Sequence, residues 1–326
     1  RVEDKNQALP YIQEGLVEFM EPNYYVYLDE GTPTSEPTPQ VMPQETAVPD
    51  TAVPLEAPAP PAPFVPNDYD KTNQWAAENI GLSYAWEHNL TGAGVRVAVI
   101  DSGVSPHEDF PLGALQPGHN YAYDDLRNEE NGTIKPKRTA DDATDFYWHG
   151  TFVAGIIAAA TNNGKGIVGM APGVQIVPLR VFYKSTLSGK VTSTAEYVAN
   201  AIADAATVYD CDVLNLSLGL SSNSEFVRDA VTRATAAGAI VVASVGNDSN
   251  STKYYPAGYH GVVGVGSIGS DGKVSSFSQK NDSVSVVAPG GSVYSLYCPS
   301  GKGTNGYNTS SGTSFSAPHV AGMAAL

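Results

Sequence analysis

Cysteine, basic side chains and long apolar runs are all scarce in this chain of 326 residues. Cys211 and Cys298 are the only cysteines and lie far apart, so neither a disulfide framework nor a zinc cluster organises the fold, although one disulfide between them stays open. With 18 Lys and Arg against 34 Asp and Glu, the formal net charge is −16, which excludes the basic face typical of a nucleic-acid-binding protein. No apolar run approaches the roughly 18 residues of a membrane-spanning helix. We therefore expect a protein that neither binds nucleic acid nor spans a membrane.

The first 66 residues differ in composition from the rest of the chain. They carry 2 basic and 11 acidic side chains, and residues 31–66 alone contain 11 prolines and no Lys or Arg. This composition favours extended polyproline conformations and cannot form a packed core, so we expect a linker. Residues 16–28 are rich in aromatic and β-branched side chains, which predicts one or two strands. The chain begins at Arg1 without an initiator Met or a signal segment, so we expect that it has been trimmed.

From about residue 67 onward, short apolar runs alternate with longer segments of small residues. The apolar runs are β-branched and nearly continuous, which is typical of strands buried on both faces of a parallel sheet. Between them lie Ala-rich stretches with helical spacing, and this alternation predicts a three-layer α/β domain. The expected strands are 95–100, 174–181, 212–218, 239–244, 262–267 and 284–288, and the expected helices are 151–160, 193–207 and 224–238.

Three segments place a polar residue at the end of an apolar run or at the start of a helix, where α/β sheets form their ligand sites. Asp101 follows an expected strand, His149 precedes an expected helix, and Ser314 precedes an apolar stretch near the end of the chain. Each has an ordinary structural explanation: a turn-capping Asp, a structural or exposed His, and a helix N-cap hydroxyl. Together they supply a hydroxyl nucleophile, an imidazole base and an orienting carboxylate, which is the set that nucleophilic hydrolysis needs.

The sequence around these three residues resembles the subtilase family of subtilisin-like serine proteases. The segments VAVIDSGV, HGTFVAGI and SGTSFSAPHVAG match the family's Asp, His and Ser motifs and stand in the family's order along the chain. The resemblance covers residues 66–326 and implies a three-layer α/β/α fold with a mostly parallel central sheet. It also implies a serine endopeptidase in which Asp101 orients His149, His149 acts as general base and then acid, and Ser314 forms the acyl-enzyme.

Further segments resemble the substrate-binding parts of the family. AIVVASVGNDS resembles the segment that ends in the oxyanion-hole Asn, here Asn247, although Asn-Asp-Ser is also ordinary turn chemistry. By the same resemblance, one strand pairs with the extended substrate backbone and another segment walls the primary specificity pocket. Gly and Ala in these walls leave room for a large apolar side chain of the substrate. The alternative that the two segments are an ordinary core strand and an ordinary turn stays open. The pairing strand contains Ser217, Leu218 and Gly219, and the pocket walls contain Ala243, Ser244 and Gly246 with the turn at Tyr255, Pro256 and Ala257.

A loop rich in Gly and Asn resembles the high-affinity calcium loop of the family. Calcium takes about six to eight oxygen ligands, so a mixture of carboxylates, a side-chain amide and backbone carbonyls suits it. A surface turn without an ion stays open, because Lys165 brings a positive charge near the loop. The ligands that the resemblance implies are the side chains of Asp109 and Asn163, the backbone carbonyls of Thr161, Lys165 and Ile167, and the side chain of Asp68.

The N-terminal region resembles the end of a subtilase propeptide. The segment GLVEFMEPNYYVYL is similar to the last propeptide strand, which lies in the substrate cleft until the enzyme cuts it, and residues 66–87 resemble the start of a mature domain. The chain stops at Leu326, inside the helix expected after Ser314, so we expect a domain truncated at its C-terminus. An unrelated N-terminal extension stays open. The implied division is a propeptide remnant at 1–30, a Pro-rich linker at 31–66 and a catalytic domain at 67–326.

Two other functional classes stay open. A non-catalytic binding module or a self-inhibited zymogen would keep an intact-looking site that is blocked by residues 1–66 or disabled by the missing C-terminus. A lipase or esterase is not favoured, since those enzymes place Ser in a G-x-S-x-G elbow and in the chain order Ser, acid, His. Trp148 and Phe152 stand where many relatives have Gly and His, but neither replaces a catalytic group. The expected partners are protein or peptide substrates and the chain's own propeptide, in a secreted, monomeric enzyme with structural calcium.

Overall fold

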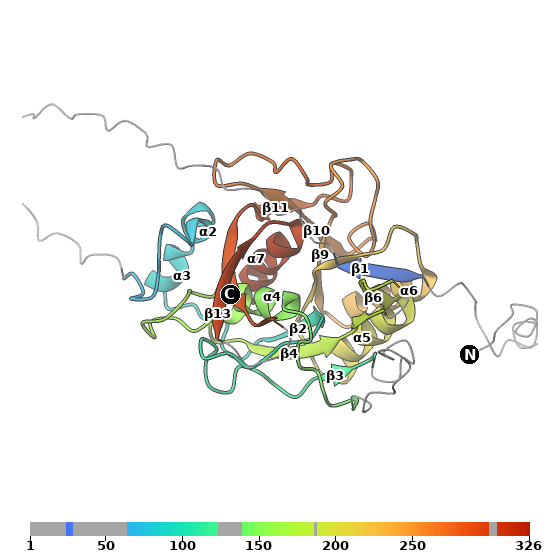
Figure 1. Cartoon of the computed structure of the whole chain (residues 1–326), viewed down its shortest axis with the longest axis horizontal. Helices are drawn as coiled ribbons and strands as arrows, with labels where there is room; N and C mark the ends of the chain where they lie inside the picture. The colour runs from blue at the N-terminus through green and yellow to red at the C-terminus, as the bar shows by residue number, and fades with distance from the viewer. Residues whose placement is uncertain (1–23, 29–63, 123–138, 186–187, 300–304) are drawn as a thin grey trace, which may run out of the picture.

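The computed structural model describes residues 24–28, 64–122, 139–185, 188–299 and 305–326, which form an α/β fold around one central sheet (Figure 1). Most of the predicted propeptide remnant and linker lies outside the described residues. Within the described ranges, no helix is long and apolar enough to cross a membrane. The two cysteines are both buried free thiols, which answers the question of a disulfide that the sequence leaves open.

The central sheet has seven strands, and every pairing between neighbours is parallel. All of the strands predicted from apolar runs are present, and this confirms the mostly parallel sheet. The additional strand, β3, is only two residues long and has no apolar run that would predict it. In spatial order the strands are β11 (Val286–Pro289), β10 (Val262–Ile268), β9 (Ile240–Ser244), β7 (Val213–Leu216), β2 (Arg96–Asp101), β4 (Gln175–Arg180) and β3 (His119–Asn120).

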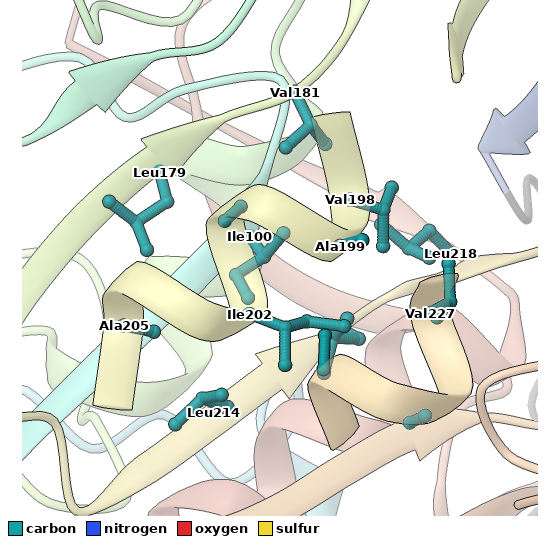
Figure 2. Close-up of a cluster of buried hydrophobic side chains, with 14 of the residues drawn as sticks. Ile100, Leu179, Val181, Val198, Ala199, Ile202, Ala205, Leu214, Leu218 and Val227 are labelled. Carbon is teal, nitrogen blue, oxygen red and sulfur yellow. The ribbon is translucent and has the colours of Figure 1, made fainter. Parts of the chain in front are cut away.

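Helices cover both faces of this sheet, which confirms the three-layer α/β/α architecture. One pair is α5 (Ala195–Thr207) and α6 (Glu225–Ala236), and the other pair is α4 (His149–Ala158) and α7 (Thr313–Ala325). Alternate residues of β2 reach opposite faces: Ala98 and Ile100 join the core under α5 and α6, while Val97 and Val99 join the core under α4 and α7. Figure 2 shows the first core, where Ile202 of α5 lies among side chains from the sheet.

The helices α5 and α6 begin at side chains that satisfy their first backbone amides. The Thr194 hydroxyl accepts a hydrogen bond from the N–H of Tyr197, and the Ser224 hydroxyl accepts one from the N–H of Val227. Past the end of α6, Gly238 has a φ of +98°, a conformation that glycine adopts without a Cβ clash. Both helices therefore lie close to the ranges that the sequence predicts.

Smaller elements surround the main sheet. In a four-stranded sheet of order β5, β6, β1, β8, the N-terminal strand β1 lies antiparallel between β6 and β8. Figure 1 shows β1 beside β6. The hairpin of β12 and β13 packs beside α4 and was not predicted from the sequence. The bounds are β1 (Tyr25–Leu28), α2 (Trp75–Asn79), α3 (Ser83–Glu87), β5 (Tyr183–Lys184), β6 (Val191–Thr194), β8 (Leu218–Gly219), β12 (Val293–Tyr297) and β13 (Gly306–Ser310).

Strand β2 stands where the chain order of the sheet reverses. Its neighbours β4 and β7 both follow it in the sequence, and they lie on opposite sides of it. Open α/β sheets form their ligand sites beyond the carboxyl ends of the strands at such a point. Asp101 is the last residue of β2, and Ser217 follows the last residue of β7. The candidate site therefore lies at the carboxyl ends of β2 and β7.

Candidate active site

The end of β2 and the start of α4 bring Asp101 and His149 together. The Nδ1 atom of His149 lies 2.9 Å from Oδ1 and 3.0 Å from Oδ2 of Asp101, and both side chains are completely buried. The Oδ1 atom also accepts a hydrogen bond from the N–H of Ser102 at 2.6 Å, which fixes the carboxylate. A carboxylate at Nδ1 sets the tautomer of the ring and stabilises its protonated form. The pair is therefore suited to take up a proton at Nε2.

Ser314 lies in the first turn of α7, next in sequence to a residue that packs on the imidazole. The next residue, Phe315, packs against the His149 ring with 5.4 Å between the ring centroids, and Ser314 itself is buried. The Ser314 hydroxyl donates a hydrogen bond to the backbone carbonyl of Ser217 at 3.4 Å. The three residues that the sequence predicts as a triad are thus carried by β2, α4 and α7 to one edge of the sheet.

The carbonyl group of Ser314 is held from outside its own helix. Residue 318 is a proline, so it has no N–H to donate to the carbonyl four residues earlier. The hydroxyl of Ser217 donates to this carbonyl at 2.6 Å, and Ser217 accepts a hydrogen bond from Nδ2 of Asn215 at 3.0 Å. All of these side chains are buried. Ser217, predicted from the sequence to contact substrate, therefore also fixes the backbone that carries Ser314.

Asn247 follows β9 and is bound to the residue that precedes Ser314. Its Oδ1 atom accepts a hydrogen bond from the N–H of Thr313 at 2.8 Å, and the Thr313 hydroxyl accepts one from the N–H of Gly246 at 3.2 Å. Because the amide oxygen is engaged by Thr313, the NH₂ group is the donor end of the Asn247 side chain. An oxyanion hole needs such a donor, held in place before the reaction starts.

Asp145 ties together the two segments that carry the carboxylate and the imidazole. Its Oδ1 atom accepts hydrogen bonds from the hydroxyl of Ser102 and the N–H of Tyr147, each at 2.9 Å. Its Oδ2 atom accepts two more from Thr151, at 2.9 Å from the N–H and 2.7 Å from the hydroxyl. Burial raises the pKa of this carboxyl group, and the four donors oppose that rise. Asp145 was not predicted from the sequence, because it is one of three closely spaced aspartates and only its burial distinguishes it.

Aromatic rings pack around the imidazole. Phe152 is completely buried and lies 4.6 Å from Phe315, and Trp148 lies 5.6 Å from both His149 and Tyr297, measured between ring centroids. Trp148 and Phe152 are the two residues that depart from the motif expected around His149. Trp148 packs on the imidazole, and Phe152 packs behind it on Trp148 and Phe315, so apolar rings adjoin the Asp101–His149 pair. An apolar environment strengthens the attraction between a carboxylate and the imidazolium that forms during the reaction.

The strand predicted to pair with a substrate backbone is paired with β1 in the structure. Leu218 and Gly219 form β8, and Leu28 of β1 lies opposite Leu218 in antiparallel register. On its other edge β1 pairs with β6, where the Thr192 hydroxyl donates to the carbonyl of Val26 at 3.1 Å. The β6 and β8 edges together can therefore hold an extended chain between them.

The residues predicted as walls of the specificity pocket lie near this strand. Ala243 and Ser244 end β9, Gly246 follows them, and all three are buried. The turn around Tyr255 is joined to the continuation of β8, because the backbone groups of Leu220 and Tyr255 exchange hydrogen bonds at 2.7 and 3.0 Å. The structure thus places both predicted walls next to the predicted pairing strand.

Comparison with known proteins identifies the family. The sequence profile of the subtilase family matches residues 92–326. The chain belongs to the subtilase family. This membership confirms the family that the three sequence motifs predict.

Named relatives of this subtilase are proteases. It is 36% identical to the minor extracellular protease Epr of Bacillus subtilis, over 79% of this chain and 35% of Epr. It is also 36% identical to thermitase of Thermoactinomyces vulgaris, over 81% of this chain and 85% of thermitase. A solved structure of a protease from Pseudoalteromonas arctica matches with a TM-score of 0.70 and 33% identity, over 80% of this chain and 86% of that one. The subtilase thus spans about a third of Epr and most of thermitase.

The loop after α4 gathers the side chains that the sequence predicts as calcium ligands. Asn163 donates its backbone N–H to Oδ2 of Asp68 at 2.8 Å and its Nδ2 to Oδ1 of Asp109 at 2.7 Å. The Oδ1 atom of Asp68 is buried without a hydrogen-bond partner, and burial raises the pKa of Asp109. The ammonium group of Lys165 bonds to Glu108 at 2.8 Å, and both side chains are exposed. The Asn163 amide oxygen accepts from the N–H of Lys165 at 2.9 Å, and Oδ2 of Asp109 accepts from the N–H of Ile167 at 3.0 Å. The two carboxylates are of the type that a hard cation prefers.

Carboxylates alone would not complete this site. Among the described residues, no three His, Cys, Asp or Glu side chains gather into a metal-binding group. Amide and carbonyl oxygens of the loop would have to supply most of the ligands, as calcium allows. The residues present therefore fit calcium better than a transition metal, which prefers nitrogen or sulfur ligands.

Proposed function

We propose that this subtilase is a serine endopeptidase that hydrolyses peptide bonds through an acyl-enzyme. The observation that carries the proposal is the buried Asp101–His149 pair beside the first turn of α7, where Ser314 lies. A relative from Bacillus sp., 36% identical over 81% of this chain and 60% of its own length, is named thermophilic serine proteinase, which supports the same activity. The reaction class that we propose is acyl transfer to water.

In the acylation half of the reaction, the Ser314 oxygen attacks the scissile carbonyl carbon while Nε2 of His149 takes the hydroxyl proton. Asp101 stabilises the resulting imidazolium. The developing oxyanion accepts hydrogen bonds from the NH₂ group of Asn247 and the N–H of Ser314. The imidazolium then gives its proton to the leaving amine, the C–N bond breaks, and the acyl group stays on Ser314.

In the deacylation half, water replaces the amine. His149 takes a proton from this water, and the water oxygen attacks the ester carbon through a second oxyanion in the same hole. The ester C–O bond breaks, His149 returns the proton to the Ser314 oxygen, and the carboxylic acid product leaves. Each residue therefore ends the cycle in its starting protonation state.

The activity test compares hydrolysis of an unstructured protein such as casein by the chain and by Ser314→Ala. We expect turnover to fall by more than about 10⁴-fold in the variant, because the nucleophile is removed. Ser221→Ala, which changes an exposed serine, serves as the control and should keep full activity. Undiminished hydrolysis by Ser314→Ala, with contaminating proteases excluded, would contradict the proposal.

We also propose that residues 1–30 are the end of an inhibitory propeptide joined by the linker at 31–66. The support is β1, whose antiparallel pairing with β6 and β8 uses the backbone groups that a substrate strand would use. The Val26 side chain is completely buried there, so β1 makes side-chain as well as main-chain contacts. The full chain would then be self-inhibited until it is cut. A non-catalytic binding module is less favoured, because all of the reacting side chains are retained.

Self-processing is tested on the purified full chain by mass spectrometry. The chain should lose its N-terminal segment with time, and Ser314→Ala should stay intact under the same conditions. A Ser314→Ala chain that is still processed in the absence of other proteases would show that the cut is not made by this site.

We propose that calcium binds the loop after α4 and stabilises the fold. When bound, the ion supplies positive charge to the buried carboxylates of Asp68 and Asp109. It would thereby tie the loop to the segment around Asp68, which is far from it in the sequence. The proposed ligands are the side chains of Asp68, Asp109 and Asn163 and the carbonyl oxygens of Thr161, Lys165 and Ile167.

The calcium proposal is tested by thermal unfolding of Ser314→Ala, which avoids self-digestion. Adding calcium should raise Tm, and the rise should disappear in a second variant that also carries Asp109→Asn. A Tm that does not respond to calcium at millimolar concentration, or that responds equally in both variants, would contradict the proposed ligands.

We further propose that the enzyme acts outside the cell. The relatives named as extracellular proteases in Bacillus subtilis and Xanthomonas campestris support this location. Detection of the chain in the culture medium rather than in the cell fraction of its source organism tests the proposal.

A further inference from the structure

Tyr254 occupies a distinctive position beside the predicted substrate-pairing strand. It directly precedes Tyr255, whose backbone exchanges two hydrogen bonds with Leu220. Leu220 in turn directly follows Gly219 of β8. The Tyr254 side chain therefore starts from a backbone that is locked to the end of β8.

The Tyr254 ring spans the distance between two glycine backbones. A Cβ atom built on Gly219 would lie 3.4 Å from Cδ1 of the ring, and a Cβ atom built on Gly246 would lie 2.6 Å from Cδ2. Cδ1 and Cδ2 are on opposite edges of a tyrosine ring, so one edge faces Gly219 and the other faces Gly246. The second distance is too short for a real side chain, so Gly246 could not be replaced without moving the ring.

The loop that carries Tyr254 is held in place by a buried glutamine. The Nε2 atom of Gln279 donates to Oδ1 of Asn250 at 2.8 Å and to the carbonyl of Thr252 at 3.0 Å, while its Oε1 accepts from the N–H of Asn250 at 3.0 Å. Its backbone N–H donates to the carbonyl of Gly246 at 3.0 Å. Gln279 thus binds both the loop and the glycine against which the ring packs.

The far end of the Tyr254 side chain is also engaged. Its hydroxyl donates a hydrogen bond to the carboxylate of Asp248, the residue that follows Asn247. Asp248 is exposed, so the hydroxyl end of the ring points toward the surface of the same loop. The ring is therefore fixed at its root, along both edges and at its tip.

We propose that Tyr254 is a specificity-determining residue that limits the substrate side chain directly before the cleaved bond to a small one. This inference rests on the proposed function, with Gly246 as a wall of the primary pocket and Gly219 as part of the substrate-pairing strand across the ring from it. The pocket walls predicted from the sequence leave room for a large apolar side chain of the substrate. In the structure the Tyr254 ring lies between Gly219 and Gly246 and takes up that room. A Phe or Leu side chain would have to displace the ring from its contacts and its hydroxyl from Asp248, whereas Ala, Gly or Ser would not.

The test uses tetrapeptide p-nitroanilides that differ only in the last residue, because the bond after that residue is then the one cleaved. Substrates ending in Ala, Phe and Lys are compared by kcat/KM, using the full chain and its own processed form. We expect kcat/KM for the Ala substrate to exceed that for the Phe substrate by about tenfold or more, because even one methylene group too many in a pocket changes kcat/KM by about that factor. A chain that prefers Phe would overturn the inference without any variant.

Two variants separate the ring from its hydroxyl. Tyr254→Gly removes the ring and should raise kcat/KM for Phe relative to Ala by about tenfold or more. Tyr254→Phe keeps the ring and loses the bond to Asp248, so it should keep the preference for Ala. An Ala-to-Phe ratio that is the same in Tyr254→Gly and the wild type would overturn the inference, provided that both react with a fluorophosphonate to the same extent.

The fluorophosphonate reaction also distinguishes failure of the specificity proposal from failure of the proposed function. A chain that is labelled at Ser314 but lacks the Ala preference contradicts this inference and leaves the proposed function standing. A chain that is never labelled, even in its processed form, contradicts both. A preference for Lys that disappears in Asp248→Asn would overturn the inference in favour of selection by charge, because the carboxylate rather than the ring would then decide the substrate.

Discussion

The hydroxyl of Ser217 donates a hydrogen bond to the carbonyl oxygen of Ser314 at 2.6 Å, where Pro318 has no N–H to offer. This bond joins the segment that leads into β8 to the helix that carries the proposed nucleophile. It therefore couples the placement of the substrate strand to the placement of Ser314.

Ser217→Ala should weaken the fold and the activity together. The substitution leaves the buried carbonyl of Ser314 without the Ser217 donor, which costs about 1–3 kcal/mol of unfolding free energy. Urea unfolding measured in a Ser314→Ala background tests the stability, and kcat of Ser217→Ala alone tests the catalysis. The exposed Ser221→Ala is the matched control. Equal unfolding free energies with and without Ser217→Ala would contradict the role given to this bond.

Asp145→Ala should lower kcat more than it changes KM. Four donors lose their acceptor, and these donors lie beside Asp101 and His149 rather than in the β8 region. Asp145→Asn keeps one oxygen acceptor and should fall between Asp145→Ala and the wild type. Steady-state kinetics on one peptide substrate measures both constants, with Asp141→Ala, an exposed neighbour, as control. A purely structural role would instead reduce the fraction of active enzyme and leave kcat per labelled site unchanged.

Asn247→Ala should reduce turnover severely while leaving KM nearly the same. Loss of one oxyanion-hole donor lowers kcat by about 10²- to 10³-fold in subtilisin, and we expect a loss of that order here. Initial rates, divided by the concentration of enzyme whose Ser314 reacts with a fluorophosphonate, measure the effect. Asn223→Ala, at an exposed position, is the control. If the change in kcat is less than about threefold, Asn247 does not donate to the oxyanion.

His319 should make the fold less stable in mild acid. Its ring is buried in α7, where Nδ1–H donates to the carbonyl of Phe315 at 2.7 Å, and burial lowers the pKa of His319 to about 4. Below its ordinary pKa of 6.5 the unfolded chain takes up a proton that the folded chain does not. The unfolding free energy should therefore fall by up to about 3 kcal/mol between pH 6.5 and pH 4.

Denaturant unfolding of Ser314→Ala at several pH values measures this dependence. The double variant with His319→Gln lacks the titrating ring, so its unfolding free energy should fall less over the same range. Identical pH dependence in the two chains would show that His319 does not contribute.

Much of the fold could be predicted because a strand buried on both faces has a continuous apolar run in its sequence. The runs at 95–100 and 239–244 are continuous and β-branched, and they became β2 and β9. The β12–β13 hairpin was missed because its strands mix Tyr, Ser, Asn and Thr without a clear alternation. Pairing across such a hairpin is decided by the surface it packs on, and that surface cannot be read from its own residues.

In the candidate site, too, some features could be predicted from the sequence and others could not. The positions of Asp101, His149 and Ser314 at the ends of elements could be predicted from the element boundaries, while their catalytic roles stay a prediction that rests on the three family motifs. The bonds of Asp145, and the one between Ser217 and Ser314, join residues that are distant in sequence or lie among similar neighbours. Tyr254 could not be assigned either, because its effect depends on two glycine backbones that only the folded chain brings to its ring.

Activation of the Ser314 oxygen by His149 underlies the whole proposed reaction, and covalent labelling of Ser314 measures it. In every sample the linker at 31–66 is first cut by the same immobilised protease, which is then removed. The full chain, His149→Ala and the unrelated surface variant His260→Ala are then treated with a fluorophosphonate, digested and mapped by mass spectrometry. We expect one added phosphonyl group on Ser314 in the wild type and in His260→Ala, and labelling at least about 10³-fold slower in His149→Ala. A phosphonyl group on another serine, or equal labelling rates in His149→Ala and the wild type, would contradict this activation.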